Sequence, residues 1–182
     1  AAKADPTISV GGILKAIEGN IKVGKSDIFV SEACEYTNSF LHFYPRYSVI
    51  LNVEAEHLDF FKDIQDIRNS FRKFAENTKK DGAIIINGEI ENYTELTSGL
   101  DPQVITFGLN DSCDYYPSDI TFDKTACASF TAMHHGTPVM DVKLHVPGMH
   151  NVSNALAAIA LSLDLGISTD AILAGLSAFG GA

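Results

Sequence analysis

The run Ala83-Ile84-Ile85-Ile86 is short, entirely apolar and followed by polar residues. Such a run is typical of a parallel strand that is buried on both faces of a sheet. Residues 27–30, 47–51 and 104–107 form three more runs of the same character, and we expect them to be strands as well. The sequence therefore predicts a sheet with several parallel strands.

A helix is expected between the strands at residues 47–51 and 83–86, beginning near Asp63, which is a suitable N-cap. Its apolar face is predicted to consist of Ile64, Ile67, Phe71 and Phe74, while Arg68, Arg72, Lys73 and Glu76 face away. A strand, a helix and a strand in this order require a right-handed crossover. We therefore expect an α/β fold, a mainly parallel sheet flanked by helices.

From Asp119 to Val146 the hydrophobic period changes to two, which is typical of antiparallel strands with one buried face. His134-His135-Gly136-Thr137 is expected to form the hairpin turn between two of them. After Pro147-Gly148 an Ala- and Leu-rich helix is predicted through Leu163, followed by a last helix from Ser168. The second half therefore predicts a small antiparallel β addition and two helices.

The composition fits one soluble globular domain of 182 residues, 46% of them hydrophobic. With 13 Lys and Arg against 23 Asp and Glu, the net charge of −10 makes nucleic acid a poor candidate partner. Three cysteines without CxxC spacing argue against a disulfide framework and a structural zinc site, and reduced thiols suggest a cytoplasmic protein. No apolar run is long enough to span a membrane.

Residues 19–26, Gly-Asn-Ile-Lys-Val-Gly-Lys-Ser, match the phosphate-loop pattern GxxxxGK[ST]. A phosphate loop must open a helix, whose first amides hold the phosphates. Here the following residues 27–30 favour a strand instead. We therefore expect a hairpin with Gly24-Lys25-Ser26 at its turn and with Lys22 and Lys25 as surface charges.

Two acidic clusters follow predicted strands directly. Glu32 and Glu35 follow the first, and Glu54, Glu56, His57 and Asp59 follow the second. Ligands of open parallel sheets bind at the carboxyl ends of strands, so the clusters could converge on a divalent cation, magnesium or manganese rather than zinc. The alternative is that Glu54 and Asp59 open a helix and His57 packs on the surface.

His150, Asn151 and Asn154 stand at the start of the Ala-rich helix. His150 or Asn151 could be an ordinary cap. Asn154 lies beside an otherwise apolar helix, and an amide offers the donor and acceptor that match the edge of adenine. His134, His135 and His145 receive no role, and Cys34 is interpreted as a packed side chain rather than a nucleophile.

These segments resemble the central, ATP-binding domain of the Mur ligases. The similar stretches are Asp5-Pro6-Thr7 with Gly11-Gly12, residues 29–35 with Ser39-Phe40-Leu41, residues 52–59, and residues 147–158. Cys34 and Glu56 depart from the family, which usually has Asp at both positions. The resemblance implies a fold like that of phosphate-loop nucleoside triphosphatases, with residues 1–182 as a fragment that lacks the upstream phosphate loop and the N- and C-terminal domains.

The resemblance also implies an activity for the full-length enzyme. ATP would phosphorylate the lactyl carboxylate of UDP-N-acetylmuramate, and L-alanine would attack the acyl phosphate, in the synthesis of peptidoglycan precursors. Glu32 and His57 would bind Mg²⁺ and act in catalysis, and His150, Asn151 and Asn154 would bind the nucleotide, with Asn154 reading adenine. The fragment itself is expected to be inactive.

Three other functions stay open at this point. One is another amide ligase of the same fold, such as a muramoyl tripeptide ligase or the folylpolyglutamate enzyme. The second is a metal-dependent phosphoester hydrolase that uses the clusters around Glu32 and His57, and the third is a phosphate-loop switch protein that uses Lys25 and Ser26.

Overall fold

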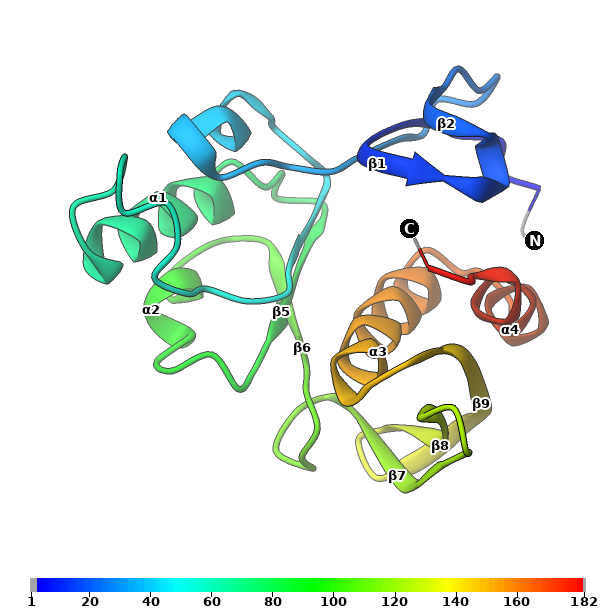
Figure 1. Cartoon of the computed structure of the whole chain (residues 1–182). Coiled ribbons are helices and arrows are strands. Elements are labelled where there is room, and N and C mark those ends of the chain that lie inside the picture. The colour runs from blue at the N-terminus through cyan, green and yellow to red at the C-terminus, as the bar shows by residue number, and fades with distance from the viewer. Residues whose placement is uncertain (1–2, 182) are drawn as a thin grey trace.

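The computed structural model describes residues 3–181 and has the expected α/β fold (Figure 1). Its larger sheet has the order β4-β5-β6-β7-β8-β9. These strands are Tyr47–Ile50, Ala83–Asn87, Gln103–Phe107, Tyr115–Phe122, Cys127–His134 and Thr137–Pro147. The pairs from β4 to β7 are parallel, and β7-β8-β9 are antiparallel. The three predicted strands β4, β5 and β6 and the antiparallel addition are confirmed.

Strand β5 shows why the sheet is covered on both faces. Ala83 and Ile85 belong to a core with α3 (Met149–Asp164), whereas Ile84 and Ile86 belong to a second core with α1 (Ile64–Glu76). All four side chains are almost fully buried. Burial of an Ile side chain contributes about 1.5–3 kcal/mol, so the run at residues 83–86 anchors both layers. Figure 1 shows α1 on one side of β5 and β6 and α3 on the other.

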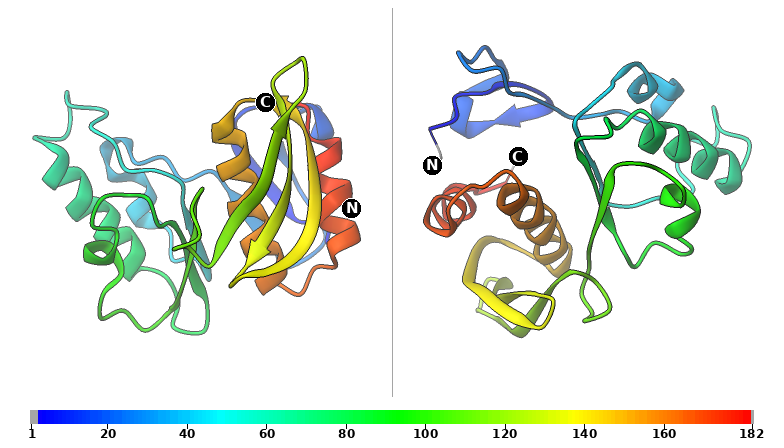
Figure 2. Two further views of the ribbon diagram at one scale, coloured as in Figure 1. Left: turned by 90° about the horizontal axis from the view of Figure 1, so that it is seen from below. Right: turned by 180° about the vertical axis from the view of Figure 1, so that it is seen from behind.

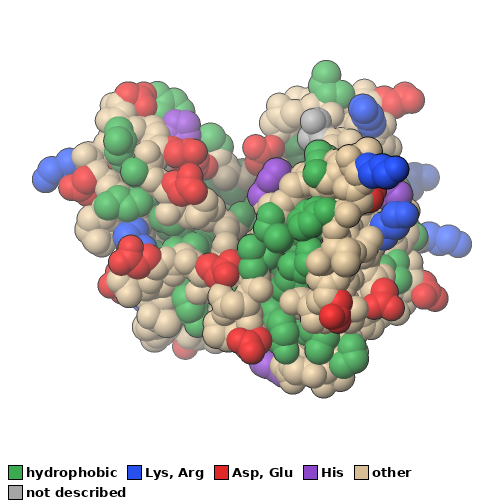
Figure 3. Space-filling view, turned by 60° about the horizontal axis from the view of Figure 1, so that its bottom comes forward, with side chains coloured by type: hydrophobic (Ala, Val, Ile, Leu, Met, Phe, Trp, Pro, Cys, Tyr) green, Lys and Arg blue, Asp and Glu red, His purple; other side chains and the backbone are tan. Residues whose placement is uncertain are grey.

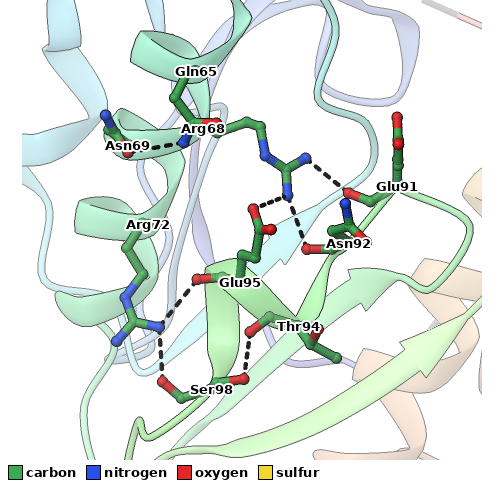
Figure 4. A network of polar contacts seen from close by, with 9 residues as sticks. All are labelled: Gln65, Arg68, Asn69, Arg72, Glu91, Asn92, Thr94, Glu95 and Ser98. Carbon is green, nitrogen blue, oxygen red and sulfur yellow. Dashed lines mark hydrogen bonds and ion pairs between the residues drawn. The ribbon is translucent and has the colours of Figure 1, made fainter.

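Helix α1 begins as expected, because the Asp63 carboxylate accepts a hydrogen bond from the Asp66 amide at 2.9 Å. The prediction that Arg68 and Arg72 face away is wrong. Arg68 donates to the carbonyl oxygens of Glu91 and Asn92, and Arg72 donates to that of Ser98, each at 2.8 Å. These carbonyls flank the short helix α2 (Thr94–Thr97), so the two arginines fasten α2 to α1 (Figure 4).

The predicted hairpin turn joins β8 to β9. His135 and Gly136 have φ values of 47° and 79°, as a two-residue hairpin loop of the primed type requires. After β9, α3 and then α4 (Thr169–Ala178) follow, with Ser168 at the N-cap position of α4. Both helices pack on the core that includes β5 to β9, and Figure 2 shows them side by side.

Residues 7–31 form a second sheet that the sequence did not predict. It consists of β1 (Thr7–Leu14), β2 (Gly19–Lys22) and β3 (Phe29–Ser31) in the order β2-β1-β3. The expected strand at residues 27–30 thus exists as β3, but it pairs with β1 and not with the larger sheet. Its Phe29 and Val30 are about half exposed, at 56% and 49%, so burial on both faces is wrong for this strand. Figures 1 and 2 show this sheet on the side of α3 and α4.

The segment with the phosphate-loop pattern opens no helix, in agreement with the sequence interpretation. The turn was misplaced, however. Residues 15–18, which include a 3-10 turn (Lys15–Ile17), join β1 to β2, and Gly24-Lys25-Ser26 lies on the connection to β3. The amides of Gly24 and Lys25 are already bonded to Thr7 Oγ1 and to Asp5, and Lys22 is paired with Asp5 at 2.9 Å. These amides are committed to the fold and do not form a phosphate cradle.

Among residues 3–181, no helix combines the length and the apolar character that crossing a membrane requires.

Candidate functional site

His57 lies in the loop that follows β4. Its backbone is left-handed (φ 53°), and its carbonyl accepts hydrogen bonds from the amides of Phe60 and Phe61 at 2.9 Å. The imidazole Nε2 lies 3.3 Å from Oε1 of Glu35, which comes from the loop after β3. Glu56 offers a third ligand atom, and all three atoms lie within 4.8 Å of one another. The structure therefore brings Glu35 of the first predicted cluster to Glu56 and His57 of the second.

Tyr36 and Asp59 make a second contact between the same two loops. The Tyr36 hydroxyl donates to Oδ2 of Asp59 at 2.9 Å, and the Tyr36 ring lies 4.8 Å from the His57 ring. The bond to the Asp59 carboxylate, together with its negative charge, raises the pKa of Tyr36 because both favour the protonated phenol. The loops after β3 and β4 are thus joined on either side of the imidazole.

Glu32 points to a different neighbour. Its Oε2 accepts a hydrogen bond from the Gly11 amide of β1 at 2.6 Å, so it does not belong to the group formed by Glu35, Glu56 and His57. A β-carbon on Gly11 would lie 3.2 Å from that carboxylate oxygen, so the glycine lets the two approach. Among residues 3–181 no hydrogen bond to Oε1 of Glu32 is found, which leaves that oxygen available to a ligand.

The start of α3 lies at the same edge of the larger sheet as the loop after β4. Strand β7 runs parallel to β4, β5 and β6, β8 runs opposite to it, and β9 therefore runs in the same direction as β4. The carboxyl ends of β4 and β9 consequently meet at one edge, and α3 begins directly after β9. This is the edge at which open α/β sheets bind ligands.

The three polar residues at the start of α3 have different surroundings. Asn151 donates through Nδ2 to the Pro147 carbonyl at 2.8 Å and lies 3.1 Å from the His150 ring, so it has a structural role at the helix start. Asn154 is exposed, and no partner for its amide is found in the described part of the chain. The N-cap residue Gly148 makes no side-chain cap, which leaves the first helix amides without that partner.

The sequence alternative for the second cluster is wrong in one respect. Glu54 and Asp59 do not open a helix, because α1 starts only at Ile64 and is capped by Asp63. Instead, Glu54 bonds to the Asn52 side chain and Asp59 bonds to Tyr36. Both carboxylates lie on the loop at the strand end, as a ligand-binding function requires.

Carboxylate oxygens and an imidazole at the exposed end of a strand suit Mg²⁺ or Mn²⁺. The side chains of His57 and Glu35 are 38% and 29% exposed, so a bound ion would keep contact with water and with a phosphate ligand. Figure 3 shows a hollow between the half of the molecule with α1 and the half with the small sheet, with acidic and His side chains along its rim. The arrangement can hold a cation against an anionic substrate.

A cavity of about 510 Å³ lies elsewhere. Its lining includes Thr78, Lys79 and Asp81 before β5 and Leu100 and Asp101 before β6. These positions belong to the amino ends of parallel strands, where α/β sheets do not bind their ligands. We therefore place the functional site at the carboxyl edge.

Sequence reasoning missed Gly11 and Tyr36. Gly11 was part of a similar stretch, but only the pairing of β1 with β3 places it beside Glu32. Tyr36 follows Glu35 directly in the sequence. Its place next to an acidic cluster was the only sequence feature that could have marked it as part of the site. Of the residues without an assigned role, His134 and His135 lie at the end of β8 and in the turn after it, away from this edge. His145 lies near the carboxyl end of β9, where its Nε2 is 3.4 Å from the Ser177 hydroxyl of α4.

Comparisons with known proteins identify the family of this chain. Residues 14–162 match the family described as the Mur ligase middle domain. UDP-N-acetylmuramate--L-alanine ligase of Agathobacter rectalis is 65% identical over all 182 residues, which cover 100% of this chain and 40% of that protein.

Two solved structures have similar folds. The MurC ligase of Thermotoga maritima has a TM-score of 0.83 at 30% identity, over 98% of this chain and 39% of that one. The MPL ligase of Neisseria meningitides, named for UDP-N-acetylmuramate and the tripeptide L-alanyl-γ-D-glutamyl-meso-diaminopimelate, has a TM-score of 0.86 at 25% identity, over 100% of this chain and 59% of that one. This chain thus spans about 40% of the length of the curated relatives it matches. The match over residues 14–162, together with the expected α/β fold, shows that the chain belongs to the Mur ligase family, as its middle domain.

Proposed function

We propose that this chain is the nucleotide-binding middle domain of a cytoplasmic ligase that uses ATP to join L-alanine to UDP-N-acetylmuramate in peptidoglycan precursor synthesis. The observation that carries the proposal is the 65% identity, over the whole chain, to a ligase of that name. The positions of Glu32 and His57 after strand ends, and of Asn154 in the early turns of α3, support it, because a nucleotide and a cation could meet at such ends.

The proposed reaction has two steps. The lactyl carboxylate of UDP-N-acetylmuramate attacks the γ-phosphorus of ATP, ADP leaves, and an acyl phosphate forms. The amine of L-alanine then attacks the acyl carbon, loses a proton, and the tetrahedral intermediate expels phosphate to leave the amide. The main physical obstacle is the approach of a carboxylate to a polyanionic phosphate, so the site must neutralise charge.

Mg²⁺ fits the donor set of this site, and when bound it would neutralise the phosphate charge. We assign the ligand roles to Glu32 and His57, as the family resemblance implies. Glu32 keeps one carboxylate oxygen free while Gly11 fixes the other. Glu35 and Glu56 lie close enough to the His57 ring to add negative charge at the same position.

The nucleotide is assigned to the start of α3. The exposed amide of Asn154 would donate to and accept from the adenine edge, and His150 and Asn151 would lie beside the nucleotide. The uncapped amides after Gly148 and the positive end of the helix dipole would also favour an anionic group there.

The phosphate loop itself is assigned to residues upstream of Ala1. In a phosphate-loop protein, a strand precedes the loop and a helix follows it. Here β3 and β4 are edge strands of separate sheets, and Phe29, Val30, Val49 and Leu51 beside them are partly exposed. An additional strand between β3 and β4 would cover these side chains and join the two sheets.

The main rival is a ligase that takes the tripeptide L-Ala-γ-D-Glu-meso-diaminopimelate instead of L-alanine. The fold does not separate the two, because the TM-scores to the MPL and MurC structures are 0.86 and 0.83. Sequence identity favours the alanine ligase, at 65% against 25%. A metal hydrolase and a phosphate-loop switch have no comparable support, and residues 19–26 open no helix.

The test is an assay of the full-length protein with ATP, Mg²⁺ and UDP-N-acetylmuramate. L-alanine should give phosphate release and the mass of the amide product, while L-Ala-γ-D-Glu-meso-diaminopimelate should give neither. His57→Ala and Glu32→Gln should each reduce turnover by more than about 100-fold without loss of fold, because each removes a cation ligand. Preference for the tripeptide would reject the proposed substrate, and phosphoester hydrolysis by residues 1–182 with Mn²⁺ would favour the hydrolase.

A further inference from the structure

Tyr36 lies between the two loops that carry the proposed metal ligands. It follows Glu35 in the loop after β3, and its hydroxyl donates to Oδ2 of Asp59 in the loop after β4 at 2.9 Å. Its ring lies 4.8 Å from the imidazole of His57, at an interplanar angle of 38°. Tyr36 thus reaches from the loop after β3 to Asp59 and His57 in the loop after β4.

The turn at His57 is fixed by its backbone, whereas the direction of the imidazole depends on side-chain contacts. A φ of 53° is uncommon for a residue other than glycine, and two amides, those of Phe60 and Phe61, bond to the His57 carbonyl and hold the turn. The imidazole itself is 38% exposed, so the protein core does not fix it. Its contacts on the protein side are Glu35, at 3.3 Å from Nε2, and the Tyr36 ring.

Phe60 contributes to the same arrangement. Its ring meets the Tyr36 ring edge to face, with the centroids 6.0 Å apart. The Tyr36 ring is therefore held by Phe60 on one side and by the bond to Asp59 at its tip. Such edge-to-face pairs are a favoured geometry for aromatic side chains.

We infer that Tyr36 is a positioning residue for His57: its ring holds the imidazole so that Nε2 faces Glu35 and Glu56, and its hydroxyl bond to Asp59 holds the ring. The metal role of His57 rests on the proposed function, whereas the position of the imidazole does not. A ligand that is already oriented loses less conformational freedom when the ion binds. Tyr36 acts through His57 and needs no contact with the ion.

The direct test is an NMR measurement on the metal-free chain. The ring protons of His57 should show a ring-current shift from Tyr36 in the wild type and in Tyr36→Phe, which keeps the ring. Tyr36→Leu should move these resonances to the values of a freely exposed histidine. Tyr44 is 68% exposed and lies outside this cluster, so Tyr44→Leu is the matched control and should leave them unchanged.

The second test is the affinity for Mn²⁺ at fixed pH, measured by electron paramagnetic resonance. Tyr36→Phe should weaken binding about twofold, because only the tether to Asp59 is lost. Tyr36→Leu should weaken binding about fivefold, because the aromatic contact is lost too. Circular dichroism of each variant checks that the fold is kept.

The outcomes separate this inference from the proposed function. If the His57 ring protons have the same shifts in the wild type and in Tyr36→Leu, the inference is wrong, whatever the metal affinity. If His57→Ala weakens Mn²⁺ binding and Tyr36→Leu does not, the inference is also wrong and the metal role of His57 stands. If His57→Ala binds Mn²⁺ as tightly as the wild type, the metal role fails, and the NMR shifts alone decide the positioning role.

Discussion

At the scale of single residues, Gly82 shows how closely two segments approach before the parallel sheet begins. A β-carbon at this position would lie 1.6 Å from the Arg46 carbonyl oxygen, an impossible distance. The same carbonyl accepts a hydrogen bond from the Ala83 amide at 3.1 Å, so the contact sets the register of β5 against β4. Glycine is required here because any side chain would separate the two strands.

We expect Gly82→Ala to lower the free energy of unfolding by about 2 kcal/mol or more, because the backbone must move to admit the methyl group. Gly12→Ala is the control, since a β-carbon there meets no atom within 4 Å. Urea unfolding followed by circular dichroism measures both. Equal midpoints for the two variants would show that the approach at Arg46 is not a constraint on stability.

At the same scale, the sequence identified the site residues by type but not by partner. Glu32, Glu35 and His57 were placed at strand ends because polar residues follow apolar runs. Which carboxylate faces the imidazole depends on the paths of two loops. Glu35 faces His57 and Glu32 faces Gly11 because β3 pairs with β1, a strand that the pattern did not reveal.

At the scale of elements, α2 has only four residues and depends on α1 for its place. Helices this short are not stable alone, because forming the first turn fixes several backbone dihedral angles for a single hydrogen bond. Arg68, with a side chain only 11% exposed, supplies bonds to two carbonyls beside α2 and an ion pair to Glu95 (Figure 4). The tertiary contacts of Arg68 stabilise α2, which is too short to be stable by its own hydrogen bonds.

We expect Arg68→Ala to reduce the free energy of unfolding by about 2 kcal/mol, because it leaves the Glu91 and Asn92 carbonyls without their charged donor. Arg46→Ala should cost less than about 0.5 kcal/mol, because that side chain is 60% exposed and its ion pair with Asp81 is solvated. Chemical denaturation gives both values, and hydrogen exchange of the α2 amides should rise in Arg68→Ala alone. Similar losses in the two variants would argue against a fastening role.

The elements that the sequence predicted share one property. Strands β4, β5 and β6 are apolar runs with polar ends, and α1 has a cap and an apolar stripe. The expected burial holds for β5 and for Ile67 and Phe74 of α1, whereas Val49 of β4 and Ile64 of α1 are 36% and 41% exposed, so their predicted burial is wrong. Strand β1 was missed because Gly11 and Gly12 interrupt it and because it is not buried. A strand that pairs without being buried leaves no hydrophobic period to read.

At the scale of the whole molecule, three ionisable groups have lowered pKa values that make the fold more stable at neutral pH than at acidic pH. Burial, and then the charge of His135, lower the pKa of His134 below its usual value of 6.5. The pKa of Asp5 is lowered by its bond with Lys22 and then by the Lys25 amide, and that of Asp123 by the Thr125 hydroxyl and then by the Cys127 amide. All three groups are thus less readily protonated in the folded state than in the unfolded state.

The sign of the effect follows from linkage. A group with a lowered pKa stabilises the fold above its unfolded pKa, and this contribution is lost as the pH falls. The free energy of unfolding should therefore decrease first below about pH 6.5, through His134, and again below about pH 3.8, through the two carboxylates. His134→Asn should remove the first decrease, whereas a change at the exposed His42 should not. Urea unfolding from pH 3 to 8 measures this, and a first decrease that persists in His134→Asn would assign it to another group.

The stretches that identified the family are short, and their places in the fold can now be compared. Three of the stretches that resemble the Mur ligases follow β3, follow β4 or begin α3, whereas the stretch from Asp5 to Gly12 lies before and on β1. The rest of the chain fixes these loops. The chain covers 40% of the length of its Agathobacter rectalis relative, so the remainder of that protein has no counterpart here.

The measurement that tests the central claim most directly is the anomalous scattering of Mn²⁺ in crystals of the full-length ligase with ADP. The account predicts a manganese peak within coordination distance of the Glu32 carboxylate or of Nε2 of His57, with adenine against Asn154. Manganese only at other positions, or a nucleotide phosphate held by the amides of Gly24 and Lys25, would contradict it.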